Sequence, residues 1–371
     1  MRIAVDARFA NTKTGIGRLT YSLISEILKL DRENFYVVLT DDVDPFPDIK
    51  YQNIKKITFK NATKRKILWQ ILYLPYILNK EKIEIFFSPN NFIIVPFFYR
   101  GKTIMTIQDL IPMVFSEYLK SKKSNIKYKL KVLLSKINEP ERIMTISEFS
   151  LQEIERLLKI SRDKIFIIKE GVDNRILDIK FTKDTLRVLG VEKPYILGIG
   201  GMEVRKNNKV LIEAFISLMQ KNSDLKHSLI IVGNRESNII PASMVTIPES
   251  LKERIHFIGE VKDNELAALY SNATIFVYPS LYEGFGLPPI EAFKHKTPVI
   301  TSNISSIPEV TGEAAILINP YKKEELEDAM FNLLRDEEKQ KELVKKGIIR
   351  LKEFDWSNTA KTLVSEFNKL K

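Results

Sequence analysis

The sequence predicts an α/β protein built from two Rossmann-like domains, each a doubly wound parallel sheet covered by helices. Short apolar runs alternate with amphipathic helical patterns in the first half of the chain, and the same alternation returns in the second half. Several of the runs are apolar throughout, as expected for parallel strands that helices cover on both faces. A chain of 371 residues also has the length expected for two domains.

The first domain is expected over residues 1–175. Short β-like runs predict its strands at Ile3–Val5, Phe35–Leu39, Ile54–Phe59, Ile83–Phe87, Lys102–Ile107, Arg142–Ile146 and Lys164–Ile168. Helical patterns lie between them at Gly17–Leu30, Lys64–Leu78, Ser121–Ile137 and Ser147–Leu158. Ser147 and Ser150 form the predicted N-cap region of the last of these helices.

The second domain is expected over residues 176–355, with the boundary near Arg175–Thr185. Its strands are predicted at Tyr195–Gly198, Leu229–Val232, His256–Ile258, Thr274–Tyr278, Pro298–Ile300 and Ala315–Ile318. Its helices are predicted at Lys206–Gln220, Asn264–Ser271, Pro288–Phe293 and Lys323–Arg335. Amphipathic helices also follow Asp336 and Asp355.

Composition excludes several classes of protein. Hydrophobic residues make up 44% of the chain and charged residues 28%, which is typical of globular proteins. No apolar run reaches the ~18 residues that a membrane span needs. We expect no signal peptide, because a charge follows the short first apolar run directly at Asp6. Cysteine is absent, which excludes disulfides and thiol chemistry and fits a cytoplasmic protein.

The positive charge is concentrated in the first half. Through Arg175 the chain has 31 Lys and Arg and 20 Asp and Glu, whereas the remainder has 27 of each. Two segments, Lys60–Leu78 and Lys120–Lys136, mix lysines with apolar residues at helical spacing. This pattern suits helices on an anionic membrane surface, where each nearby cation contributes ~1 kcal/mol. Packed helices with a solvated lysine face are the alternative. Nucleic acid is not expected as a partner, because no helix-turn-helix or RNA-binding signature is present.

The most informative segment runs from Tyr278 to Ala292. A buried strand is predicted before it, a loop with Gly284 and Gly286 follows, and two prolines mark the start of a helix. Glu283 then lies in the loop and Glu291 in the opening turn of the helix. Free amides at a helix start suit a phosphate, and carboxylates accept hydrogen bonds from hydroxyls. This combination predicts a nucleotide-sugar site. The alternative is a tight turn before a helix with an acidic start.

The Glu283-to-Glu291 segment resembles the signature of the retaining glycosyltransferases of family 4. Other pieces of this chain follow in the family's order, and they cover nearly its whole length: Arg2–Arg8, Thr14–Arg18, Thr106–Pro112, Glu170–Asp173, Glu203–Asn207, Pro298–Ser302 and Ser305–Glu309. The resemblance is strongest to bacterial mannosyltransferases that build cell-surface polysaccharide. It implies the GT-B arrangement, in which two Rossmann-like domains face each other across a cleft and the C-terminal helix (about 356–371) packs back on the first domain.

The resemblance also implies roles for individual residues. The donor binds in the second domain, where Glu291 holds the ribose and Glu283 the hydroxyls of the transferred sugar. Arg205 and Lys206 stabilise the departing diphosphate, where negative charge grows in the transition state. No metal or other cofactor is then expected, because the cation pair takes that role. The remaining residues expected to bind the nucleotide sugar are Gly15, Gly17, Gly201, Gly233, Val261, Gly284, Phe285, Gly286 and Leu287.

Four further features of the sequence bear on possible binding sites. The stretch Gly198–Gly201 lacks the third glycine of a dinucleotide fingerprint, so NAD binding is rejected. Asp42 and Asp44 resemble a metal-binding Asp-x-Asp pair, but their position favours a turn. The backbone near Val232–Asn234 and Gly259–Val261 is the expected contact for the base. The histidines His227, His256 and His295 have no metal-ligand or triad spacing.

Gln108 departs from the family, whose members have His before the aspartate that corresponds to Asp109. Glutamine forms hydrogen bonds but does not titrate near neutral pH. Either the family's histidine acts by hydrogen bonding alone, or this enzyme has a different donor, acceptor or activity. Gln108 is a candidate acceptor-side residue, and Asp109 is expected to orient an acceptor hydroxyl. A plain turn at the end of a strand is the alternative for Asp109.

These observations predict a retaining hexosyltransferase that uses a nucleoside diphosphate sugar and a lipid-linked or polysaccharide acceptor. GDP-mannose is the first candidate donor, with UDP-glucose and UDP-N-acetylhexosamine open. A cytoplasmic location at the inner face of the cell membrane follows from the basic first half. Two alternatives remain. One is a nucleotide-sugar epimerase on the same fold, and the other is a membrane-associated binding subunit whose catalysis has lapsed.

Overall fold

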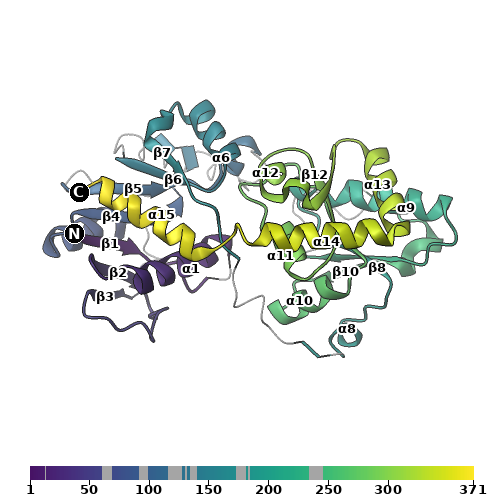
Figure 1. The fold of residues 1–371 in the computed structure, drawn as a ribbon, viewed down its shortest axis with the longest axis horizontal. Coiled ribbons are helices and arrows are strands. Elements are labelled where there is room, and N and C mark those ends of the chain that lie inside the picture. The colour runs from purple at the N-terminus through teal and green to yellow at the C-terminus, as the bar shows by residue number, and fades with distance from the viewer. Residues whose placement is uncertain are drawn as a thin grey trace. The chain divides into compact units, whose positions relative to one another are not determined.

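The computed structural model describes residues 1–12, 14–60, 69–91, 99–115, 128–129, 132–133, 140–172, 181–182, 184–233 and 245–371. The chain divides into two compact units, each with its own parallel sheet (Figure 1). Unit 1 comprises Met1–Gly171 and Asp355–Lys371, and unit 2 comprises Val172–Phe354. We had expected the first domain to extend to residue 175, four residues beyond the end of the first segment.

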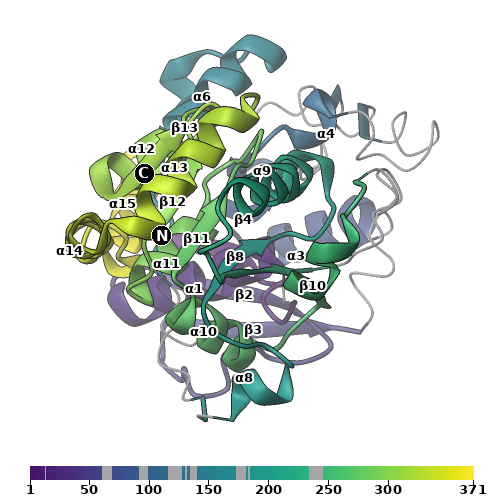
Figure 2. The same ribbon diagram turned by 90° about the vertical axis from the view of Figure 1, so that its right-hand side faces the viewer.

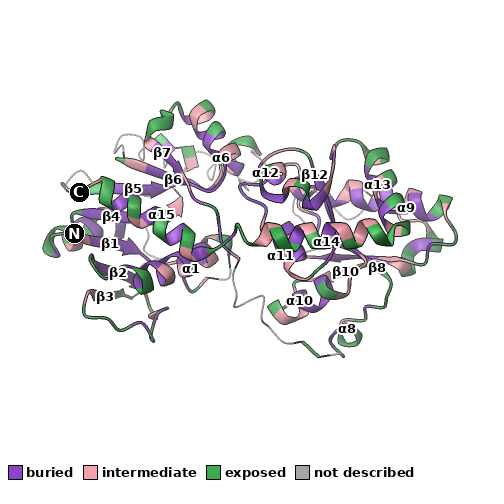
Figure 3. Cartoon of the chain, in the orientation of Figure 1, coloured by how far each residue is buried: buried purple, intermediate pink, exposed green. Residues whose placement is uncertain are grey.

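Unit 1 contains a seven-stranded sheet in the order β3-β2-β1-β4-β5-β6-β7, with every neighbouring pair parallel. The strands are β1 (Arg2–Asp6), β2 (Phe35–Asp41), β3 (Ile54–Phe59), β4 (Ile85–Asn91), β5 (Lys102–Thr106), β6 (Arg142–Thr145) and β7 (Ile165–Ile167). They confirm the seven strands predicted for this half. The central strands are buried (Figure 3), as parallel strands covered on both faces must be.

The helices of unit 1 are α1 (Gly15–Leu30), α3 (Leu74–Lys80), α4 (Ile111–Val114), α6 (Glu148–Glu153) and α15 (Trp356–Lys369). Short π-helical turns precede α3 at Trp69–Tyr73 and continue α6 at Ile154–Leu158, and a 3₁₀ turn spans Arg162–Lys164. Ser147 caps α6 by accepting from the Ser150 amide at 3.0 Å, as predicted. Most of the predicted helix Ser121–Ile137 and the start of Lys64–Leu78 lie outside the described residues.

The C-terminal helix α15 packs against α1 in unit 1 (Figure 1). Phe367 meets Phe87 of β4 edge-on, with ring centroids 5.9 Å apart. Glu366 pairs with Arg142 of β6 at 2.9 Å. Gly171 permits this return of the chain, because a Cβ there would lie 2.5 Å from the Trp356 ring. Residues between 185 and 280 positions apart in sequence therefore pack together in unit 1.

Unit 2 contains a six-stranded parallel sheet in the order β10-β9-β8-β11-β12-β13. The strands are β8 (Tyr195–Ile199), β9 (Ser228–Val232), β10 (Ile255–Gly259), β11 (Ile275–Tyr278), β12 (Val299–Ser302) and β13 (Ala315–Ile318). The helices are α8 (Thr185–Val188), α9 (Asn208–Lys221), α10 (Asp263–Asn272), α11 (Leu287–Lys294), α12 (Ile307–Thr311), α13 (Lys323–Arg335) and α14 (Glu337–Leu351). Short 3₁₀ turns occur at Val204–Lys206, Glu249–Arg254 and Gly312–Ala314.

Helices cover both faces of the unit 2 sheet. Alternate residues of β8 point to opposite cores: Ile196 packs with α9 and α13, whereas Tyr195 and Leu197 pack with α10 and α11. Figure 2 shows α9 and α13 on one side of this sheet and α10 and α11 on the other. The predicted doubly wound fold is confirmed for both units. No helix within the described ranges is long and apolar enough to cross a bilayer.

Candidate active site

The loops that follow β8 and β11 meet at the switch point of the unit 2 sheet. The chain order runs outward from β8 through β9 to β10, and outward in the opposite direction from β11 through β12 to β13. Open α/β sheets bind ligands outside the carboxyl ends of their strands at such a reversal. The backbone ties these two loops together, because the Leu281 amide and the Ser280 hydroxyl both donate to the Arg205 carbonyl, at 2.7 and 2.9 Å.

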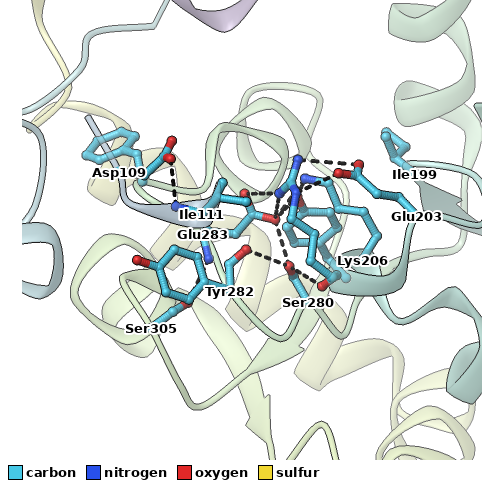
Figure 4. A network of polar contacts seen from close by, with 12 residues as sticks. Asp109, Ile111, Ile199, Glu203, Lys206, Ser280, Tyr282, Glu283 and Ser305 are labelled. Carbon is cyan, nitrogen blue, oxygen red and sulfur yellow. Dashed lines mark hydrogen bonds and ion pairs between the residues drawn. The ribbon is translucent and has the colours of Figure 1, made fainter. Parts of the chain in front are cut away.

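Glu283 is the centre of a buried polar network in these loops (Figure 4). Its Oε1 accepts from Lys206 Nζ at 2.8 Å, Ser280 Oγ at 2.7 Å and Tyr278 Oη at 2.6 Å. Arg205 Nη1 lies 2.9 Å from both carboxylate oxygens. Lys206 Nζ also donates to Tyr278 Oη. The structure therefore brings together Glu283, Arg205 and Lys206, which the sequence had placed in separate motifs.

The network keeps Glu283 ionised. Burial alone would raise the pKa of Glu283, but Lys206 and Arg205 outweigh it and hold the pKa at about 2. Burial lowers the pKa of Lys206, and the Glu283 carboxylate opposes that effect. Arg205 Nε also donates to Glu203 at 2.8 Å. Two cations therefore face two carboxylates, and the network is neutral as a whole. In this network Glu283 is a charged acceptor of hydrogen bonds.

The turn that carries Arg205 and Lys206 differs from the prediction. We predicted a helix from Lys206 and weighed a solvated helix start as the alternative. Instead both residues lie in a 3₁₀ turn and are largely buried, and α9 begins at Asn208. Asn207 has a left-handed backbone (φ 56°), and the Asn208 side chain donates to the Ile199 and Gly201 carbonyls. The left-handed residue separates the 3₁₀ turn from α9, so the helix begins two residues later than predicted.

Gly200 makes room for the buried lysine. Its φ is +102°, and a Cβ there would lie 2.5 Å from Lys206 Cγ. Gly201 and Gly233 are close neighbours, because a Cβ on Gly233 would lie 2.6 Å from the Gly201 amide nitrogen. Val261 packs against the core on the α10 side. The predicted base contact at Asn234 lies outside the described residues.

The loop after Glu283 leads into α11 as the glycines and prolines predict. Gly286 is the N-cap with φ 112°, Leu287 is the first helical residue, and the two prolines follow. Ser306 Oγ donates to the carbonyls of Glu283 and Phe285, at 2.9 and 2.6 Å, and so fixes the loop. Gly284 and Phe285 complete this loop. The amides of Gly284–Leu287 therefore belong to a well-supported loop at a helix N-terminus.

Glu291 lies in the second turn of α11, because the helix begins at Leu287. Our placement in the opening turn is therefore wrong. The carboxylate of Glu291 accepts from Tyr270 Oη of α10 at 3.0 Å, and Tyr270 is itself buried. Tyr270 is one of the residues that sequence reasoning missed. Tyr278, Ser280, Glu203 and Ser306 are others, and only their position within or beside the recognised motifs signalled them.

The predicted residues of unit 1 lie at the start of α1 and after β5. Thr14 caps α1 through the Gly17 amide at 3.2 Å, and a Cβ on Gly17 would clash with the Thr12 carbonyl at 2.1 Å. Gly15 has open space around its Cα. Gln108 is buried, and its Nε2 has no hydrogen-bond partner among the residues that the structure describes. Asp109 Oδ1 accepts from the Ile111 amide at 3.1 Å and so begins α4 (Figure 4).

Glu170 is a buried carboxyl in unit 1 that the mechanism expected from the sequence does not use. Burial and then the charge of Asp109 raise the pKa of Glu170 to about 8. Because the folded pKa lies above the unfolded value, the proton that Glu170 holds stabilises the fold below pH ~4.5, and this contribution is lost as the pH rises to about 8.

We expect the melting temperature of wild type to fall relative to Glu170→Gln between pH 5 and pH 8. In the middle of this range, the difference in free energy of unfolding between wild type and Glu170→Gln should change by ~1.4 kcal/mol per pH unit. Thermal unfolding of both proteins across a pH series measures it. Parallel curves would contradict the raised pKa.

The remaining candidates have structural roles. Asp44 caps a turn by accepting from the Phe46 amide at 2.8 Å and pairs with Lys56 at 2.8 Å, which fits the turn that we favoured. His295 stacks on Tyr270, and its Nδ1 lies 3.0 Å from Ser271 Oγ. Within the described ranges no three His, Cys, Asp or Glu side chains are grouped to hold a metal ion.

This chain is similar in sequence to several known proteins. Residues 184–350, nearly all of unit 2, match the family model of the glycosyl transferases group 1. The chain is 30% identical over 276 residues to O-antigen chain mannosyltransferase B of Escherichia coli, covering 72% of this chain and 71% of that protein. It is 26% identical over 336 residues to O-antigen chain mannosyltransferase RfbU of Salmonella typhimurium, covering 88% and 89%.

Among solved structures, the fold matches that of Anabaena HepE in complex with UDP and glucose. The TM-score is 0.71 at 16% identity, and each chain is covered completely. This likeness concerns the fold, whereas the family follows from the matches in sequence. The chain belongs to the group 1 glycosyl transferases.

Proposed function

We propose that this protein transfers a hexose, with mannose as the first candidate, from a nucleoside diphosphate sugar to a glycan acceptor with retention of configuration. The observation that carries the proposal is the buried network of Arg205, Lys206 and Glu283 at the switch point of unit 2. Two relatives named as O-antigen chain mannosyltransferases support mannose and polysaccharide synthesis. Because HepE was solved with UDP, a uridine nucleotide is the competing donor to guanosine.

The cation pair suits a diphosphate leaving group. In transfer, the bond from the anomeric carbon to the diphosphate oxygen breaks, and a bond to the acceptor oxygen forms on the same face. The acceptor's proton passes to the departing diphosphate. Arg205 and Lys206 are fixed by Glu283 before the ligand binds, so they need little reorganisation as charge develops. We propose that this pair replaces a metal ion.

Glu283 and Glu291 are proposed to hold hydroxyl groups of the donor. Four donors contact Oε1 of Glu283, whereas Oε2 accepts only from Arg205 within the described part of the chain. Oε2 is therefore the oxygen proposed for a hydroxyl of the transferred sugar. Glu291 is proposed to hold the ribose, and the amides of Gly284–Leu287 the sugar and phosphate.

Tyr270→Phe is expected to raise KM for the donor about threefold to tenfold with little change in kcat. Tyr270 Oη orients the Glu291 carboxylate, and a hydrogen bond to a charged group contributes ~1.5–3 kcal/mol, of which binding senses a part. Steady-state kinetics with varied donor measure this. Tyr195→Phe is the matched control, because its hydroxyl bonds the Leu269 carbonyl next to Tyr270 without contacting Glu291. Equal effects of the two variants would contradict the role of Tyr270.

The acceptor is proposed to be lipid-linked, which places the reaction at the inner face of the cell membrane. The net charge of the first half supports this. Most residues of the basic segments lie outside the described ranges. Within them, Leu72, Tyr73 and Tyr76 are exposed, and Lys80 Nζ lies 5.7 Å from the centroid of the Tyr76 ring. Exposed aromatic and basic residues on one short helical segment suit a lipid surface. Co-sedimentation with vesicles rich in anionic lipid at low salt tests this part, and failure to sediment would overturn it.

The donor is tested by thermal shift with nucleoside diphosphates and their sugars. A ligand at a hundredfold excess over Kd stabilises the native protein by ~2.7 kcal/mol. One nucleotide family should raise the melting temperature of wild type, and Arg205→Ala should abolish the shift. Arg335→Ala is the control, since Arg335 is an exposed arginine of unit 2 paired with Asp224. If no nucleotide shifts wild type, the transferase proposal fails and a lapsed binding subunit becomes the better reading.

A further inference from the structure

A second group of buried polar side chains lies in unit 1, at the switch point of the seven-stranded sheet. The chain order reverses between β1 and β4. Asp6 is the last residue of β1, and Asn90 lies at the end of β4. The carboxyl ends of two adjacent parallel strands therefore bring these side chains together, at the place where open α/β sheets bind ligands.

Four residues form this switch-point cluster: Asp6, Arg8, Trp69 and Asn90. Arg8 donates to both oxygens of Asp6, from Nε and Nη2, at 2.8 Å each. Asn90 Nδ2 donates to Asp6 Oδ2 at 3.0 Å. The Arg8 guanidinium stacks on Trp69, with its carbon 3.4 Å from the ring centroid. Asp6, Arg8 and Trp69 are at most 3% exposed, so their geometry is set by the surrounding core.

Each of three cluster residues keeps one buried polar atom without a hydrogen-bond partner in the described part of the chain. These atoms are Arg8 Nη1, Trp69 Nε1 and Asn90 Oδ1. Gln108 Nε2 is a fourth such atom. The backbone amide of Gln108 donates to Oδ1 of Asn91, the residue after Asn90, at 2.8 Å. An unpaired buried group costs ~1–3 kcal/mol, and native proteins contain few of them. Other such atoms occur elsewhere in the described residues, but three of them belong to this one cluster of four residues, and a ligand would supply their partners.

The mixture of donors and acceptors indicates an uncharged, hydroxyl-bearing ligand. Asp6 pairs with Arg8 through Nε and Nη2, so Nη1 is the guanidinium nitrogen that remains for a ligand. Arg8 Nη1, Trp69 Nε1 and Gln108 Nε2 are donors, whereas Asn90 Oδ1 is an acceptor. A phosphate only accepts hydrogen bonds when fully ionised, and it would face Asn90 Oδ1 unfavourably. A sugar hydroxyl both donates and accepts, so it can satisfy both kinds of atom.

We propose that the switch-point cluster binds hydroxyl groups of an uncharged sugar residue of the acceptor, and so helps to determine acceptor specificity. This inference rests on the proposed function, because it supplies the acceptor site of a sugar transferase. Arg8, Trp69 and Asn90 contact the acceptor sugar, and Asp6 is a positioning residue that holds Arg8 and Asn90.

The test measures binding of methyl α-D-mannopyranoside, methyl α-D-glucopyranoside, N-acetylglucosamine and inorganic phosphate by ligand-detected NMR. Nucleotide binding is measured on the same samples. Wild type should bind at least one of these sugars. Trp69→Phe, Asn90→Ser and Arg8→Lys should each raise the Kd for that sugar about twofold to tenfold, as expected for the loss of one hydrogen bond. The nucleotide Kd should stay within twofold. Tyr99→Phe is the control, because its hydroxyl bonds the Ile83 carbonyl near the amino end of β4.

A stability measurement separates this role from a structural one. Trp69→Phe leaves a small cavity in the core and weakens the stack on Arg8, so its melting temperature should fall modestly while the nucleotide Kd stays within twofold of wild type. The inference is overturned if Trp69→Phe binds the sugar as tightly as wild type does. It is also overturned if phosphate binds in place of the sugars and Arg8→Lys abolishes the binding of phosphate. Binding of nucleotide without binding of any of the three sugars also overturns it. Absence of nucleotide binding instead refutes the proposed function.

Discussion

Glu283→Gln is expected to destabilise unit 2 by about 3–5 kcal/mol, the cost of removing one partner from a buried ion pair. The carboxylate accepts four hydrogen bonds at Oε1 and is a counter-charge to both Arg205 and Lys206. Glutamine of the same size cannot neutralise them, so a buried positive charge is left uncompensated. Urea denaturation of the variant and of wild type measures the difference.

A double variant tests whether charge pairing is the cause. Glu283→Gln/Lys206→Met removes one charge of each sign, and it should recover part of the stability lost by Glu283→Gln alone. Interacting residues show coupling energies of about 0.5–3 kcal/mol in such cycles. Additive effects of the two substitutions would mean that the pair is not coupled in the folded protein.

The single variant Glu283→Gln should also transfer sugar more slowly than wild type, by the same factor at every pH between 5 and 9. The pKa of Glu283 is held at about 2, so its stability contribution is present above the unfolded pKa and is lost only as the pH falls toward 2. In the working range the carboxylate stays ionised. A loss of activity that follows a titration between pH 5 and 9 would show that Glu283 exchanges a proton, against the structure.

Lys206→Met is expected to slow sugar transfer about a hundredfold to a thousandfold, chiefly in kcat. Groups fixed where charge develops contribute ~2.7–4 kcal/mol to the transition state. Lys206 is buried and held by Glu283 and Tyr278, so it is prepared for the charge of the leaving diphosphate. Release of nucleoside diphosphate, measured with donor and acceptor varied separately, gives kcat and KM.

Lys209→Met is the matched control. It makes the same change three residues later, at a half-buried lysine of α9 that lies 3.8 Å from Glu213. A kcat within twofold of wild type is expected there. If Lys206→Met keeps a kcat within tenfold of wild type, or raises only KM, Lys206 contributes to ground-state binding and not to departure of the diphosphate.

The strand–loop–helix order around Glu283 was predictable because its signals are local. An apolar run predicts β11, the glycines predict the loop, and the prolines predict the start of α11. Lys206 shows the limit of local signals. The pattern predicted a helix from that residue, but Asn207 has a left-handed backbone and α9 begins only at Asn208. Helix propensity does not reveal a single left-handed residue of this kind, because tertiary contacts of Arg205 and Lys206 hold the preceding turn.

The sequence by itself determined the alternation of strands and helices, because hydrophobic periodicity is set by neighbouring residues. It also placed Arg205, Lys206, Glu283 and Glu291 in motifs with a recognisable order. Only the tertiary structure decided their partners. Lys206 and Glu283 are 77 residues apart, and they meet because β8 pairs with β11. Asp6 and Asn90 are 84 residues apart, and they meet because β1 pairs with β4. Strand order is set by packing of the whole sheet, so the ionisation of Glu283 and the unpaired atoms of the switch-point cluster arise only in the folded chain.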